Sequence, residues 1–140
     1  MVIVMRILVV DGSERVRKSL IRFLELENKY ETVFEAETVK DAKRIMQSIM
    51  IEVLLLDIQL NDNSGVELIN FCNSQLHKPV VIVCSNYSLP QYINIYETLS
   101  VNKFFDKSSE LPEMKKFIKG ITAQNKDDMR RYRNTINFVH

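Results

Sequence analysis

The sequence is short of cysteine, glycine and net charge, and each shortage argues against a class of protein. Two cysteines in 140 residues are too few for a disulfide framework, and Cys84 ends an apolar run, so we expect it to be a buried thiol. The chain has three glycines, and only Gly12 follows the first apolar run, where a dinucleotide-binding enzyme needs a glycine-rich turn. A formal charge of +1 favours neither a nucleic acid nor an anionic membrane as partner.

Long apolar runs are also missing. No run approaches the ~18 residues of a membrane span. The apolar start, residues 1–5, is interrupted by Arg6 and no small-residue cleavage site follows, so we interpret it as the lead into a strand rather than as a signal peptide. We therefore expect a cytoplasmic protein without membrane contact. An apolar content of 46% and a charged content of 26% are typical of a globular domain.

The stretch that ends at Asp57 organises the chain. Four apolar residues, Val53-Leu54-Leu55-Leu56, lead directly into this carboxylate, and a polar loop then runs to Gly65. A short apolar run bounded by turn residues is typical of a strand that is buried on both faces. Asp57 would lie at the carboxyl end of that strand. In open α/β sheets this edge is where ligands bind.

Short apolar strands alternate with amphipathic helices along the chain. We predict strands over residues 5–10, 32–36, 53–56, 80–84 and 102–105, and helices over residues 14–27, 39–49, 66–76, 92–99 and about 110–122. Ser13 and Thr38 are the predicted N-caps of the first two helices. Five strand–helix units predict an α/β domain with a doubly wound, five-stranded parallel sheet and right-handed crossovers.

The end of the chain differs from the rest in composition. Residues 123–140 are strongly polar and include a basic run, Arg130-Arg131-Tyr132-Arg133. We predict one domain over residues 1–122, followed by a tail or helical extension over residues 123–140. This segment is too short to form a DNA-binding domain.

Polar side chains follow four of the predicted strands. These residues are Asp11, Asp57, Ser85 and Lys107. The carboxyl ends of parallel strands share one edge, so we expect these groups to lie together. Two carboxylates can hold Mg²⁺, which prefers oxygen ligands, and an ammonium can neutralise a phosphoryl oxygen. A carboxylate can itself accept a phosphoryl group, so the set suits phosphoryl transfer to Asp57.

The chain resembles the response-regulator receiver domains (CheY-like) of two-component signalling. The matching stretches are Ile7-Leu8-Val9-Val10-Asp11, Leu54-Leu55-Leu56-Asp57 through Gly65, Val81-Ile82-Val83-Cys84-Ser85 and Lys103-Phe104-Phe105-Asp106-Lys107. The resemblance runs to about Ile121. It implies a (βα)5 flavodoxin-like fold with strand order 2-1-3-4-5.

The resemblance also implies a role for each residue at this edge. Asp57 would take a phosphoryl group from a histidine kinase or a histidine phosphotransfer protein. Mg²⁺ would be held by Asp11, Asp57 and the backbone carbonyl of Gln59. Ser85 and Lys107 would bind the phosphoryl oxygens.

Ser85 and Phe104 would then act as a switch. Phosphorylation would change a face built from the fourth helix, the fifth strand and the fifth helix. That face would bind a downstream protein target and is a candidate homodimer interface.

Several positions depart from the family pattern. Gly12 stands where the family has an acid that normally touches Mg²⁺, so we expect Mg²⁺ binding to be weak. Glu14 is close in sequence, and its reach to the site is left open. Asn61 and Ser108 replace prolines, and Asn86 is bulkier than the usual small residue.

Two other functions are alternatives to a phosphoryl-accepting receiver, and the sequence favours only the first of them. Gly12 favours a pseudo-receiver, a protein-binding module that works without phosphorylation. A phosphatase with an aspartyl intermediate normally has a second acid two residues after the nucleophile, and here that residue is Gln59. We therefore expect no turnover enzyme.

Overall fold

The computed structural model describes residues 5–27, 31–57, 60, 65–85, 98–99 and 101–121. Several predictions fall outside these residues. They concern Gln59, Asn61, Asn86, the fourth helix apart from Thr98 and Leu99, and the tail over residues 123–140.

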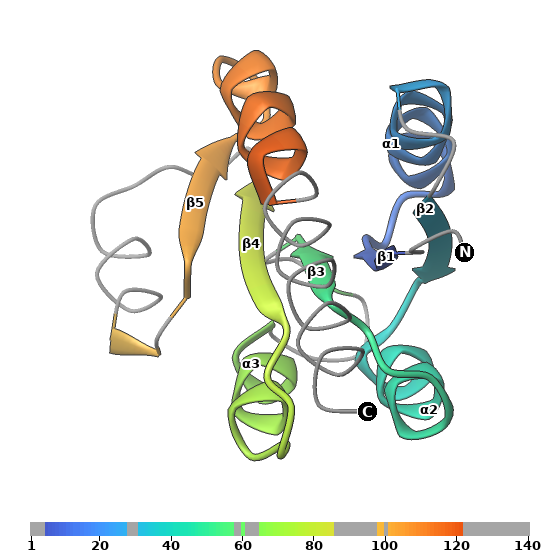
Figure 1. Ribbon diagram of the computed structural model, residues 1–140, viewed down its shortest axis with the longest axis vertical. Helices are drawn as coiled ribbons and strands as arrows, with labels where there is room; N and C mark the ends of the chain where they lie inside the picture. The colour runs from blue at the N-terminus through green and yellow to red at the C-terminus, as the bar shows by residue number, and fades with distance from the viewer. Residues whose placement is uncertain are drawn as a thin grey trace, which may run out of the picture.

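The described residues form a five-stranded sheet in which every neighbouring pair of strands is parallel (Figure 1). Its order is β2-β1-β3-β4-β5, so the predicted fold class is confirmed. The strands are β1 (Met5–Val10), β2 (Glu31–Ala36), β3 (Val53–Leu56), β4 (Val80–Ser85) and β5 (Lys103–Asp106). β3 is the central strand, with β1 and β4 on either side, so the ends of β1, β3 and β4 lie side by side.

β5 begins one residue later than the sequence predicts. Asn102 lies directly before the strand, where its side-chain oxygen accepts a hydrogen bond from the Val81 amide at 2.8 Å. Its own amide donates to the Val81 carbonyl at 3.0 Å. The strand ends at Asp106, which pairs in register with Ser85, and this pairing brings Lys107 to the edge of the sheet.

Helices cover both faces of the sheet. Helix α1 (Glu14–Glu27) and a helix over residues 111–121 lie on one face, and α2 (Val39–Ser48) and α3 (Gly65–Asn73) lie on the other (Figure 1). Both predicted N-caps are confirmed: Ser13 Oγ accepts from the Val16 amide at 3.3 Å, and Thr38 Oγ1 accepts from the Asp41 amide at 3.1 Å. No helix in the described part of the chain has the length and apolarity needed to cross a membrane.

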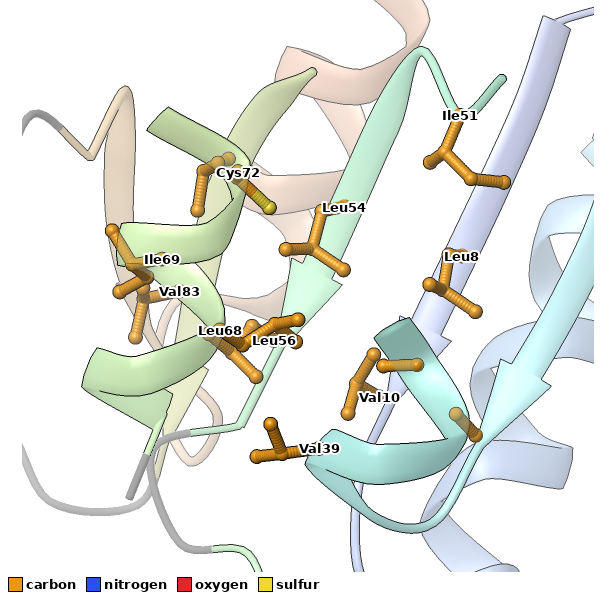
Figure 2. Close-up of a cluster of buried hydrophobic side chains, with 13 residues drawn as sticks. Leu8, Val10, Val39, Ile51, Leu54, Leu56, Leu68, Ile69, Cys72 and Val83 are labelled. Atoms are coloured by element: carbon orange, nitrogen blue, oxygen red, sulfur yellow. The ribbon is translucent and has the colours of Figure 1, made fainter. Parts of the chain in front are cut away.

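The helices pack on the sheet through two hydrophobic clusters. The first lies between the sheet and helices α2 and α3; side chains of β1, β3 and β4 face Val39, Leu68 and Cys72 there (Figure 2). The second lies between the sheet and helices α1 and 111–121, and includes Met114 and Ile118. Alternate residues of each central strand feed the two clusters, which explains why β3 is apolar throughout.

The end of α3 corrects one prediction. The spacing of apolar residues suggested a helix to Leu76, but α3 ends at Asn73 and Leu76 is 92% exposed. The backbone tightens after Asn73: the Gln75 amide donates to the Cys72 carbonyl at 3.2 Å, and Ser74 Oγ donates to the Phe71 carbonyl at 2.7 Å. The Asn73 side chain points away from the helix, and its Nδ2 donates to the Leu99 carbonyl at 2.8 Å. The Ser74 hydroxyl competes with continued helix for a backbone carbonyl, so the apolar period alone did not predict the end.

Candidate functional site

Asp11 is held at the end of β1 by its backbone and its side chain. Its amide donates to the Ala36 carbonyl of β2 at 3.1 Å. Its Oδ1 accepts from the Ser13 amide at 2.9 Å, which turns the chain into α1. The residue is only 3% exposed, although it carries a carboxylate. A buried carboxylate needs a compensating charge, and the next strands supply one.

Asp57 follows β3 and is tied to the same edge. Its amide donates to the Val10 carbonyl at 2.9 Å, which places it directly beside the end of β1. Its side chain is 15% exposed, more than that of Asp11 at 4%. Asp57 is therefore the more accessible of the two carboxylates.

Lys107 brings these carboxylates together. Its amide donates to the Ser85 carbonyl at 2.9 Å, which fixes the turn after β5. Its Nζ donates to Asp57 Oδ2 at 3.0 Å and also to Asp11 Oδ2. Burial alone would lower the pKa of Lys107, but the hydrogen bonds and charges of the two carboxylates outweigh it and raise the pKa above its ordinary value. The ammonium is thus held in its charged form between two anions.

Ser85 and Phe104 lie beside this group on β4 and β5. Ser85 is 1% exposed and is the last residue of β4. Phe104 pairs in register with Val83, is half-buried, and packs against the cluster under α2 and α3. Of the six residues proposed from the sequence, Asp11, Asp57, Ser85 and Lys107 therefore lie at one edge. Phe104 lies in the neighbouring strand, and Gln59 is outside the described residues.

The cysteine beside the site is not a candidate nucleophile. Cys84 is buried, as predicted, and burial raises the pKa of its thiol to about 12, although the charge of Lys107 acts in the opposite direction. Burial likewise raises the pKa of Cys72 to about 12. Only the thiolate is reactive, so both thiols are inert near neutral pH.

The donor set fits Mg²⁺ through two carboxylates. Mg²⁺ in proteins is commonly bound by one or two carboxylates and keeps several waters, so Asp11 and Asp57 are ligands of the right kind. No group of three His, Cys, Asp or Glu residues suited to a metal exists among the described residues. Glu14 is described, so it does not complete a set of three with Asp11 and Asp57. The acid missing at Gly12 is not replaced from the start of α1.

Sequence reasoning missed one charged residue at this edge, Arg17 of α1. It is 7% exposed, donates from Nη1 to the Asp11 carbonyl at 2.7 Å, and donates from Nε to Glu35 Oε1 at 3.1 Å. A signal was present in the sequence. Arg17 lies three residues before Leu20 and seven before Leu24, so it occupies the apolar stripe of its helix.

Comparison with known proteins agrees with this geometry. The family model described as the response regulator receiver domain matches residues 7–119. The chain belongs to this family. It is thus a receiver domain of two-component signalling, and domains of this family are signalling domains that are generally not turnover enzymes. Receiver domains interact with histidine kinases and typically bind Mg²⁺.

Individual relatives of this receiver domain are distant in sequence. The chain is 28% identical over 124 residues to the sensory transduction protein LytT of Bacillus cereus, a match that covers 86% of this chain and 50% of LytT. It thus spans about half the length of that curated relative. The fold matches a CheY-like receiver domain protein from Methanospirillum hungatei with a TM-score of 0.79 and 21% identity, over 90% of this chain and 99% of that one.

A second structural relative carries a metal. The response regulator TrrA from Thermotoga maritima, solved in complex with Mg²⁺-BeF, matches with a TM-score of 0.73 and 25% identity. The match covers 83% of this chain and 97% of the TrrA chain.

Proposed function

We propose that this receiver domain accepts a phosphoryl group on Asp57 from a phosphohistidine of a histidine kinase or phosphotransfer protein. The observation that carries the proposal is the Lys107 ammonium, which donates to the carboxylates of both Asp57 and Asp11. Asp57 is the more exposed of the two carboxylates, so an incoming phosphoryl group reaches it more readily.

The transfer needs a nucleophile and a counter-charge. A carboxylate oxygen of Asp57 attacks phosphorus, the phosphorus–nitrogen bond of the donor breaks, and its electron pair returns to the imidazole. Lys107 stays charged because its pKa is raised, so it neutralises the negative oxygens of the transferred group. The buried setting strengthens this attraction relative to bulk water.

Mg²⁺ would be held by Asp11 and Asp57, with the backbone carbonyl of Gln59 as a further ligand. When bound, the ion neutralises charge on the phosphoryl oxygens. Gly12 contributes no carboxylate, so the ion is held more weakly than at a site with three acids. The structural relative TrrA was solved in complex with Mg²⁺-BeF, which supports Mg²⁺ binding by this fold.

The transferred group changes the surface near β5. Ser85 binds a phosphoryl oxygen, Phe104 turns inward beside it, and the face of the fourth helix, β5 and the 111–121 helix changes its contacts with a downstream protein or a second copy. The half-buried position of Phe104 supports this role, because the ring is neither fixed in the core nor fully in solvent. The chain contacts no nucleic acid directly in this scheme.

Intact-mass spectrometry after incubation with acetyl phosphate tests the acceptor. We expect the gain of one phosphoryl group in the presence of Mg²⁺, no gain in Asp57→Asn, and an undiminished gain in Asp106→Asn. Asp106 is a matched control, because it is a carboxylate at the end of β5 on the same edge of the sheet. Phosphorylation that persists in Asp57→Asn would show that the acceptor is another residue.

Gly12 favours a second function, a protein-binding module that works without phosphorylation. Lys107 then serves as a permanent counter-ion to Asp11 and Asp57. This alternative predicts no gain of mass from acetyl phosphate or from a phosphorylated histidine protein, and partner binding that is the same with and without phosphodonor.

A further inference from the structure

Arg17 is buried at the functional edge without being one of the residues proposed for the reaction. The described part of the chain buries three polar or charged residues, Asp11, Arg17 and Ser85, and all three belong to this edge. A buried guanidinium loses its hydration and requires partners of its own. The identity of these partners therefore indicates what Arg17 does.

The guanidinium of Arg17 joins three elements. Nη1 donates to the backbone carbonyl of Asp11 at the end of β1, and Nε donates to the Glu35 carboxylate of β2. Glu35 also accepts from Lys18 at 2.7 Å. The hydrogen bond from Lys18 is the largest effect on the Glu35 carboxyl and, with the bond from Arg17, lowers its pKa although burial acts in the opposite direction. Arg17 thus links α1, β2 and the peptide of Asp11.

The peptide of Asp11 is consequently held from two sides. Its amide donates to Ala36 of β2, and its carbonyl accepts from Arg17. The Asp11 side chain is also held at both oxygens, because its Oδ1 accepts from the Ser13 amide and its Oδ2 accepts from Lys107 Nζ. With the backbone fixed as well, the carboxylate has little freedom.

We propose that Arg17 is a positioning residue, which fixes the peptide of Asp11 so that the Asp11 carboxylate faces Lys107 and the metal position. This proposal rests on the proposed function in one respect, the use of Asp11 as a metal ligand. Arg17 itself touches neither the phosphoryl group nor the metal. It acts through Asp11.

The same strand carries a matched control at its other end. Arg6 pairs with Glu52 at 3.4 Å, and its amide donates to Glu52 Oε2 at 2.8 Å. Arg6 lies near the start of β1, at the end of the strand opposite to Asp11, and Glu52 lies directly before β3. Its replacement removes an arginine–glutamate pair that is more exposed than that of Arg17, since the arginine side chains are 40% and 9% exposed, and leaves the functional edge intact.

Lysine is the informative replacement for both arginines. It keeps the positive charge but presents a compact ammonium instead of a planar fork, so it cannot make the separate Nε and Nη1 bonds of Arg17. Arg17→Lys and Arg6→Lys therefore preserve net charge. They differ in the end of the strands at which guanidinium hydrogen bonds are lost.

Native-state hydrogen exchange followed by NMR reads each edge directly. The amides of Asp11 and Ser13 report the functional edge, and the amides of Glu52 and Val80 report the opposite edge. The ratio of protection between the two edges cancels any global loss of stability. We expect Arg17→Lys to lower the protection of the functional edge relative to the other by about tenfold, and Arg6→Lys to change the ratio in the opposite direction or leave it unchanged.

The Mg²⁺ dependence of unfolding gives a second readout that a purely structural role would not move. A ligand that binds only the folded state stabilises it in proportion to the logarithm of one plus the ratio of free ligand concentration to its dissociation constant. The dissociation constant for Mg²⁺ therefore follows from unfolding measured over MgCl₂ against KCl at equal ionic strength. We expect Arg17→Lys to weaken apparent Mg²⁺ affinity about fivefold or more and Arg6→Lys to leave it unchanged.

The two readouts separate failure of this proposal from failure of the proposed function. An unchanged exchange ratio in Arg17→Lys would overturn the positioning role, whatever the metal does. An equal effect of both lysine variants on the ratio would also overturn it. If the unaltered protein shows no Mg²⁺-dependent stabilisation, the metal part of the proposed function fails, and the exchange ratio still decides the role of Arg17.

Discussion

The ammonium of Lys107 separates two carboxylates that would otherwise repel each other. Its side chain is 13% exposed, and it donates to both Asp11 and Asp57. When one member of a buried ionic group is removed, the remaining charges are left without compensation, and this costs more than an exposed ion pair contributes. The three side chains therefore act as one unit in stability as well as in chemistry.

Replacing Lys107 tests this unit. We expect Lys107→Met to lower the free energy of unfolding by about 3 kcal/mol at neutral pH, because two carboxylates lose their shared counter-ion. Lys43→Met is the control, because Lys43 pairs with Glu67 on the partly exposed surface and its loss should cost about 0.5 kcal/mol. Chemical denaturation of both variants measures the difference. Equal losses would show that burial of the Lys107 group contributes nothing.

The pH dependence of stability gives an independent check on Lys107. Its pKa in the folded protein is raised above 10.5, so its contribution is fully present below about pH 10.5 and is lost as the pH rises through the folded value. Between neutral and strongly alkaline pH, the unaltered protein should therefore lose more stability than Lys107→Met does. Denaturation curves of both proteins across that range measure the two losses. An equal loss of unfolding free energy in both proteins would contradict the raised pKa of Lys107.

Gly12 is the residue at which a single change could restore the family pattern. We expect Gly12→Asp to strengthen Mg²⁺ binding about tenfold, because ligand charge tunes affinity for hard cations. Without Mg²⁺ the same variant should be less stable, because a third carboxylate adds repulsion. Gly120→Asp is the matched control, since a side chain there meets nothing within 4 Å and adds the same charge away from the site. An equal gain in Mg²⁺ affinity in both variants would point to general electrostatic attraction.

Strand–helix units position the site, and their predictability from the sequence varies along the chain. The core strands were predictable because burial on both faces leaves continuous apolar runs, as in β3. N-caps at Ser13 and Thr38 were predictable because a side-chain oxygen before an apolar-periodic segment has a specific local function. The end of α3 was not predictable, because it depends on two polar side chains. Ser74 bonds the Phe71 carbonyl within the helix, and Asn73 bonds the carbonyl of Leu99, which is distant in sequence.

The same division holds for the polar groups at the carboxyl edge. Asp11, Asp57 and Lys107 could be grouped from the sequence, because each follows a strand and parallel strands end at one edge. The sequence could not show that Lys107 donates to both carboxylates, since side-chain geometry depends on the turn after β5. The partners of Arg17 lie on β1 and β2, so its role required the tertiary structure.

The correction at α3 leads to a prediction about two leucines, Leu68 within the helix and Leu76 beyond its end. Leu68 is 0% exposed and lies in the cluster under α2 and α3, whereas Leu76 is 92% exposed. We expect Leu68→Ala to cost about 3 kcal/mol through the lost burial and the remaining cavity. Leu76→Ala should change the free energy of unfolding by less than about 0.5 kcal/mol. A large loss in Leu76→Ala, measured by denaturation, would show that this side chain packs on something in solution.

For the molecule as a whole, the described members of both hydrophobic clusters lie at or before residue 121. Among the described residues, the last apolar members of the cluster beneath α1 are Ile118 and Ile121 of the 111–121 helix. The sheet, its two helical layers and the edge with Asp57 and Lys107 therefore draw on residues up to 121. From this we expect residues 1–122 to fold alone.

Truncation after residue 122 tests this domain boundary. We expect the shortened chain to keep its free energy of unfolding within about 0.5 kcal/mol of the full chain, because it keeps every cluster member found among the described residues. Sedimentation of both chains at equal concentration should then give the same association state. A shift from dimer to monomer in the shortened chain would instead show that the basic run in residues 123–140 joins two copies. A loss of stability without a change in association would show that residues 123–140 pack against residues 1–122 of the same chain.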